Sequence, residues 1–176
     1  MDLSIKLKAI IGTAAFTLAL ITFEHFDGGV ITHYPLADDN LPGISNWWGM
    51  LTIPLLTWIT FSFTGRRKNN DNSRPPAHLI KNPYLLGGLV FGAIVGLLWE
   101  IDQEAILQYF IMLPVLLALF AKVYLPESLL GFALGMLYTF GGVLPIGIGL
   151  VLQVIGFIIY VTFHRSALWV FARFNQ

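Results

Sequence analysis

The chain of 176 residues is apolar at 56% of its positions and charged at only 11%, and its formal net charge is zero. A soluble domain carries a charge at about a quarter of its positions, so the composition predicts that lipid surrounds most of the surface. Zero net charge argues against nucleic acid as a partner, because that needs a basic field, and the absence of cysteine excludes disulfides, Cys-ligated zinc and thiol catalysis.

The first apolar segment is predicted to be a membrane helix and not a cleaved signal peptide. Two lysines precede an apolar run that ends at Glu24 and His25, whereas a signal-peptide cleavage site requires small residues. The aliphatic stems of the lysines can lie along the apolar surface while their charges reach water. We therefore expect a retained first span over residues 5–24.

The apolar segments as a whole predict an all-α, single-domain, polytopic membrane protein with about six spans. A helix that crosses the bilayer needs roughly 20 residues of mainly apolar character. Only Gly141 and Gly142 divide the last two segments, so a re-entrant arrangement of that pair stays open. The expected spans are residues 5–24, 46–64, 84–101, 104–122, 127–141 and 143–163.

The positions of the basic residues support six spans and give an orientation. With the N-terminus in the cytoplasm, six spans place every Lys and Arg of the chain on the cytoplasmic side, as the positive-inside rule requires. Five spans would place Arg165 and Arg173 outside. Both termini are therefore expected in the cytoplasm, and the small size and short loops suit a multi-pass protein of the bacterial inner membrane.

The inner loop of residues 65–83 is basic and contains two adjacent prolines. Basic residues next to a span are attracted to anionic lipid head groups. We expect a solvated connector here, with a loop that docks a partner protein as the alternative.

Three glycines form a flat face on the third span. Gly88, Gly92 and Gly96 follow the spacing GxxxGxxxG, which lets a neighbouring backbone approach closely. We expect this face to pack against another span of the same chain. A homo-oligomer or a membrane partner that binds the same face is the alternative.

Acidic and histidine side chains gather on the expected outer side, in the cap loop of residues 25–45 and at the span ends beside it. Glu24 and Glu100 each lie at the outer end of an apolar segment, where ionisable groups are costly and often functional. A partly desolvated carboxylate suits acid–base chemistry. These two glutamates are therefore the candidate catalytic residues.

The same loop carries residue types that bind divalent metals. Imidazole nitrogen and carboxylate oxygen together suit zinc, although the His-x7-His spacing of the loop matches no helix-face metal motif. The outer cluster can be a solvated acidic cap, a divalent metal site, or a metal-free proton or substrate relay. The candidate metal ligands are His25, His33, Asp38 and Asp39.

Two glutamines within the spans offer a different site. Gln153 lies near the middle of the sixth expected span, and Gln108 lies about one turn into the fourth. A buried glutamine most often bonds a neighbouring helix, but these two could also line a polar path that opens outward.

The leading hypothesis is a small enzyme or binding protein with an outward-facing Glu/His/Asp site that holds a divalent metal such as zinc. A small-solute or ion transporter and an accessory subunit of a membrane complex are the alternatives. An enzyme predicts tightly clustered histidines and carboxylates. A transporter predicts a cavity that reaches Gln153, and an accessory subunit predicts an exposed stripe of glycines.

Overall fold

The computed structural model describes residues 3–34, 40, 42–69 and 82–174, and it is mostly helical, as the sequence predicts. Two short strands pair antiparallel, with Thr32 opposite Ser45. The elements in chain order are α1 (Leu3–Phe26), β1 (Thr32–His33), β2 (Ile44–Ser45), the 3₁₀ helix η2 (Asn46–Trp48), α2 (Gly49–Asn69), α3 (Pro83–Glu100), α4 (Glu104–Phe110), α5 (Leu113–Leu117), α6 (Pro126–Phe140) and α7 (Val143–Phe174).

Three of the expected spans are helices that are long and apolar enough to cross a membrane. In the part of the chain that the structure describes, these are α1, α3 and the stretch Val143–His164 of α7. Large apolar side chains are exposed along all three helices, which suits a lipid environment. The chain is therefore a helical protein with the composition of a membrane protein.

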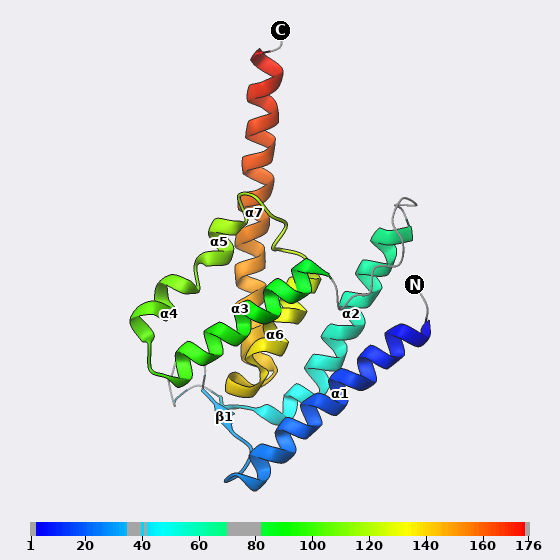
Figure 1. Ribbon diagram of the computed structural model, residues 1–176, viewed down its shortest axis with the longest axis vertical. Coiled ribbons are helices and arrows are strands. Elements are labelled where there is room, and N and C mark those ends of the chain that lie inside the picture. Colours follow the sequence, from blue (N-terminus) through cyan, green and yellow to red (C-terminus); the bar gives the residue numbers. More distant parts are fainter. Residues whose placement is uncertain (1–2, 35–39, 41, 70–81, 175–176) are drawn as a thin grey trace.

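The fourth expected span differs from the prediction, because residues 104–122 do not form one helix. α4 ends at Phe110, and α5 begins at Leu113 with Pro114 in its first turn. Proline lacks a backbone N–H, and its ring clashes with the carbonyl of the residue four positions earlier, which here is Phe110. The segment therefore breaks into two short helices, which curve beside α3 in Figure 1.

α3 and α6 form the closest helix pair of the molecule, and glycines make it possible. A methyl group added at Gly88 would overlap the backbone carbonyl of Ser128, and one added at Gly92 would overlap that of Phe132. A methyl group added at Gly96 would lie 2.8 Å from the hydroxyl oxygen of Thr139. Successive residues of α3 thus meet successive residues of α6, so the two helices run parallel. The glycine face packs within the chain, as the sequence predicts.

α1 and α2 form an antiparallel hairpin on the other side of α6. Lys6 Nζ donates to Ser62 Oγ at 2.6 Å near one end, and Thr57 donates to the hydroxyl of Thr13 at 3.1 Å in the middle. The main apolar core lies where α2 meets α6. Its buried members are Ile53, Leu56, Leu129, Leu130, Ala133 and Leu137.

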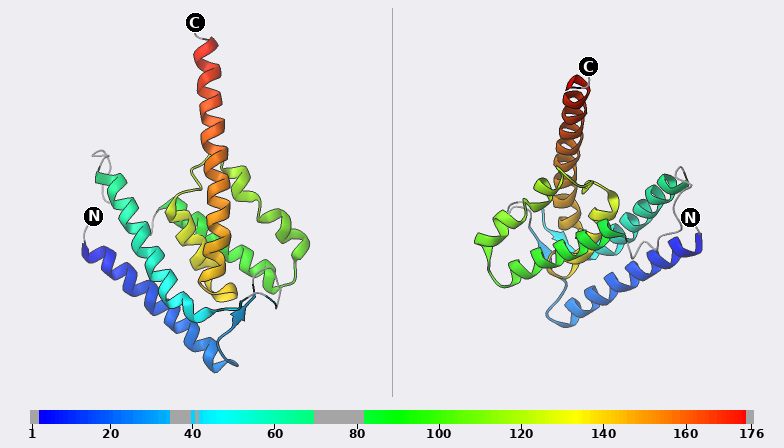
Figure 2. Two further views of the ribbon diagram at one scale, coloured as in Figure 1. Left: turned by 180° about the vertical axis from the view of Figure 1, so that it is seen from behind. Right: turned by 45° about the horizontal axis from the view of Figure 1, so that its top comes forward.

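α6 and α7 are separate helices joined by Gly141 and Gly142, as the glycine pair predicts. Gly141 has a φ of +65°, a left-handed value that favours glycine. α7 then returns along α6 and extends well beyond the other helices toward the C-terminus, as Figures 1 and 2 show.

Candidate functional site

Glu24 is buried at the end of α1, where hydrogen bonds hold its carboxylate. The side-chain amide of Asn46 donates to Oε1 at 2.9 Å, and the backbone N–H of Ile31 donates to Oε2 at 3.3 Å. Hydrogen bonds to a charged group are among the stronger ones in proteins. The carboxylate therefore joins the last turn of α1 to η2 and to the segment before β1.

Asn46 extends this connection to the α6–α7 turn. Its backbone N–H donates to the carbonyl of Ile31 at 3.0 Å, and it is only 4% exposed. A methyl group added at Gly141 would overlap the Asn46 amide. Glu24, Asn46 and Gly141 thus fix the end of the α1–α2 hairpin against the end of α6.

His33 lies beside this group and packs against Phe140, with the two ring centroids 5.9 Å apart. Its Nε2 atom is buried and has no hydrogen-bond partner among the described residues. Burial lowers the pKa of His33 from its ordinary value of 6.5, and the negative charge of Glu24 partly opposes this effect. The imidazole is therefore neutral at pH 7 and has a ring nitrogen able to bind a further group.

The other predicted site residues do not join Glu24 and His33. The side chains of His25 and Glu100 are exposed, and the ring of His25 contacts that of its neighbour Phe26. Asp38 and Asp39 lie outside the described residues. Within the described ranges, no three His, Asp or Glu side chains lie close enough to hold a metal ion.

The two glutamines have different surroundings. Gln153 is partly buried, and its Nε2 donates to the backbone carbonyl of Leu125 at 2.7 Å. Gln108 is exposed on α4. Gln153 lines a cavity between α3, α5, α6 and α7, and Gln108 is not among the residues that line it.

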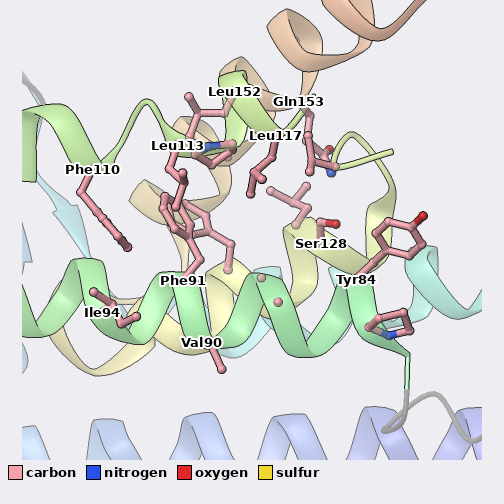
Figure 3. A pocket seen from close by; sticks show the side chains of 18 residues that line it. Tyr84, Val90, Phe91, Ile94, Phe110, Leu113, Leu117, Ser128, Leu152 and Gln153 are labelled. Atoms are coloured by element: carbon pink, nitrogen blue, oxygen red, sulfur yellow. The ribbon is translucent and has the colours of Figure 1, made fainter. Parts of the chain in front are cut away.

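A cavity of about 310 Å³ lies between α3, α5, α6 and α7. Most of its lining is apolar and includes Phe91, Ile94, Phe110, Leu117 and Phe132. Figure 3 shows Phe110 and Ile94 toward one end, and Tyr84, Ser128 and Gln153 toward the other. The cavity is thus apolar along most of its length and polar at the end near the start of α3.

Glycine and proline shape this cavity. Gly87 and Gly88 lack side chains on the wall formed by α3, and Gly149 lacks one on α7. Pro114 begins α5 after the helix break and itself lines the space. The sequence predicts the glycine face that includes Gly88, but it does not predict that Gly88, Gly149 and Pro114 border a common cavity.

A second buried carboxylate, absent from the sequence prediction, lies at the start of α6. Glu127 is 1% exposed. Arg67 donates to both of its oxygens at 2.9 Å, and the hydroxyl of Thr64 donates to Oε1 at 2.7 Å. The position after Pro126 was the available signal, because proline and acidic residues are common in the first turn of a helix. The group joins α2 to α6.

Comparison of the chain with protein-family models, curated proteins and solved structures found no match.

Proposed function

We propose that this chain is a membrane-embedded binding protein that takes a lipid-soluble molecule into the cavity between α3, α5, α6 and α7. The observation that carries the proposal is the cavity itself, with its volume of about 310 Å³ and its largely apolar lining. Ligand sites in proteins usually have volumes of roughly 300–1,000 Å³, are mainly apolar and contain a few polar groups. The cavity meets each of these criteria.

The residues that line the cavity favour an apolar ligand over an ion or a polar solute. It reaches Gln153, which is the feature expected of a transporter. However, of the described residues that line it, none carries a charge. An ion would lose its hydration there without gaining a charged partner. A molecule already dissolved in the bilayer has apolar surroundings before it binds, so it would lose little solvation free energy on entering the cavity.

We also propose that the chain crosses the bacterial inner membrane six times, with both termini in the cytoplasm. The helix directions support this topology, because α3 and α6 run parallel and two helices that both cross outward must do so. Arg67 and Glu127 pair at one end of α2, and Glu24 and Asn46 pair at the other.

The absence of cysteine makes this topology simple to test. Single cysteines are introduced by Glu104→Cys and by Arg66→Cys, both at exposed positions. A membrane-impermeant maleimide should label the Glu104→Cys variant in spheroplasts and the Arg66→Cys variant only after lysis. The reverse pattern would contradict the proposed orientation.

A second candidate function is a metal-dependent enzyme at the outer cluster. The observation that favours it is the buried Nε2 atom of His33, which lacks a partner among the described residues and lies close enough to feel the charge of Glu24. Glu24 would then act as acid or base beside His33, without His25 and Glu100, which the fold leaves exposed. Elemental analysis of the wild type and His33→Ala tests this, since a real site must bind near-stoichiometric metal that the variant loses.

The cavity proposal is tested by photolabelling in lipid nanodiscs. A long-chain alkane with a diazirine in its chain is activated by light, and the labelled peptides are mapped by mass spectrometry. We expect labels to concentrate on the cavity walls, at residues such as Phe91 and the buried Phe132. Equal labelling of all lipid-facing apolar residues would contradict the proposal.

A matched pair of variants makes this test specific. A side chain added at Gly87 starts in open space, and Gly87 lines the cavity. A side chain added at Gly12 also starts in open space, but on α1, away from the cavity. Gly87→Leu should therefore reduce labelling of the cavity, whereas Gly12→Leu should leave it unchanged. Equal labelling of both variants would also overturn the proposal.

A further inference from the structure

The polar side chains of the cavity gather at one end. Tyr84 comes from the first turn of α3, Ser128 from the first turn of α6, and Gln153 from α7. Figure 3 shows these three side chains toward one end of the pocket, Ile94 and Phe110 toward the other end, and Phe91 between them. A ligand that fits both parts must itself have one polar end.

The length and volume of the cavity limit the ligand to a narrow molecule. The α3 residues that line it run from Pro83 to Ile94, which is a rise of roughly 16 Å along a helix. Its volume of about 310 Å³ lies at the low end of the roughly 300–1,000 Å³ that ligand pockets usually have. A volume this small, spread over three turns of helix, suits one extended chain.

The chemistry of the polar end limits the head group. The hydroxyls of Tyr84 and Ser128 can each donate or accept a hydrogen bond, and the amide of Gln153 has an NH₂ donor and a carbonyl acceptor. One Gln153 donor already bonds Leu125, which holds the side chain in place. Within the described lining there is no Lys or Arg to neutralise a phosphate or carboxylate, and an unpaired charge in such surroundings is costly.

We propose that the ligand is a single-chain lipid with an uncharged hydroxyl or carbonyl head, bound with its head between Tyr84, Ser128 and Gln153 and its chain along α3 toward Phe110. This inference rests on the proposed binding function and names its ligand class. A plain hydrocarbon leaves the polar end without partners, and an ionised fatty acid places a negative charge there.

Competition against the photoreactive alkane tests the proposal. The three competitors share one chain length and are a long-chain alcohol, the matching alkane and the matching fatty acid, measured where the acid is ionised. The alcohol should compete best. Because one hydrogen bond contributes about 0.5–1.5 kcal/mol, the alcohol should exceed the alkane by roughly two- to tenfold for each bond that forms.

Isosteric variants locate the head group. Tyr84→Phe and Ser128→Ala each remove one hydroxyl and should weaken competition by the alcohol while leaving that of the alkane unchanged. Tyr138→Phe is the control, because Tyr138 is exposed on α6 and does not line the cavity.

Each contrary result has a distinct meaning. If alcohol and alkane compete equally, and the two variants match Tyr138→Phe, the head-group proposal is wrong while the binding function stands. If the ionised acid competes best, the uncharged head is wrong. If the photoreactive alkane does not label the cavity at all, both proposals fail.

Discussion

The side chain of Gln153 on α7 donates a hydrogen bond of 2.7 Å to the backbone carbonyl of Leu125, the residue before α6. This bond ties the connection between α5 and α6 to the first third of α7. It also fixes the amide at the polar end of the apolar cavity. One contact therefore links the fold to the proposed ligand site.

Replacing Gln153 should destabilise the protein as well as alter the site. Gln153→Leu leaves the partly buried Leu125 carbonyl without this donor, and a hydrogen bond within a protein contributes about 0.5–1.5 kcal/mol of net stability. We expect a lower midpoint in thermal unfolding, followed by circular dichroism in detergent. Gln108→Leu is the control, because Gln108 is exposed on α4. Equal midpoints for both variants would show that the bond does not stabilise the fold.

Removal of Asn46 should have a larger effect than removal of Glu100. Asn46→Ala deletes the amide that bonds the buried Glu24 carboxylate, and hydrogen bonds to charged groups contribute about 1.5–3 kcal/mol. Glu100→Gln changes an exposed carboxylate and should leave unfolding unchanged. If Glu24 serves only this structural role, Glu24→Gln will retain ligand binding. A variant Asn46→Ala as stable as wild type would contradict the role assigned to the pair.

The ion pair between Arg67 and Glu127 should stabilise the junction of α2 and α6. The Glu127 side chain is 2% exposed and that of Arg67 is 46% exposed. The expected loss for Arg67→Leu, about 2 kcal/mol, lies between the values for surface pairs and for buried pairs. Arg66→Leu, at an exposed neighbouring position, is the control. Chemical unfolding in detergent measures the difference, and equal stability of the two variants would refute the prediction.

Acid should weaken the fold through His33. Burial lowers its pKa from 6.5, so the unfolded chain binds this proton more readily than the folded chain. The contribution of His33 is therefore fully present above pH 6.5 and is lost as the pH falls below that value toward the folded pKa. His33→Gln should flatten this part of the stability profile, whereas His25→Gln should not. An unchanged slope in His33→Gln would assign the acid sensitivity to another group.

Hydropathy predicted the long helices because a helix that faces lipid is apolar along most of its length. The ranges predicted for α1, α3 and α7 agree with the structure to within a few residues at their starts, and the glycine pair correctly divided α6 from α7. Pro114 was visible in the sequence, but a proline within an apolar segment can kink a helix or break it. The surrounding helices decide between these outcomes, so the break between α4 and α5 was not predicted.

The site was harder to predict because it depends on residues that are distant in sequence. Chemical type alone identified Glu24 and His33, which lie close enough for the charge of one to affect the other. It also selected Glu100 and His25, which the fold leaves exposed. The cavity arises where glycines on α3 and α7 border the space beside the broken fourth segment. The cavity depends on how α3 packs on α6. The glycine spacing predicts that α3 packs closely against another helix, but it does not identify that helix.

The most direct test of the proposed binding function is native mass spectrometry of the protein taken from its own membrane with minimal detergent. We predict a retained uncharged lipid of defined mass on the wild type and on Gly12→Leu, and its loss from Gly87→Leu. The same bound lipids on Gly87→Leu as on the wild type, or no retained lipid on any of the three, would contradict the assignment of the cavity as a ligand site.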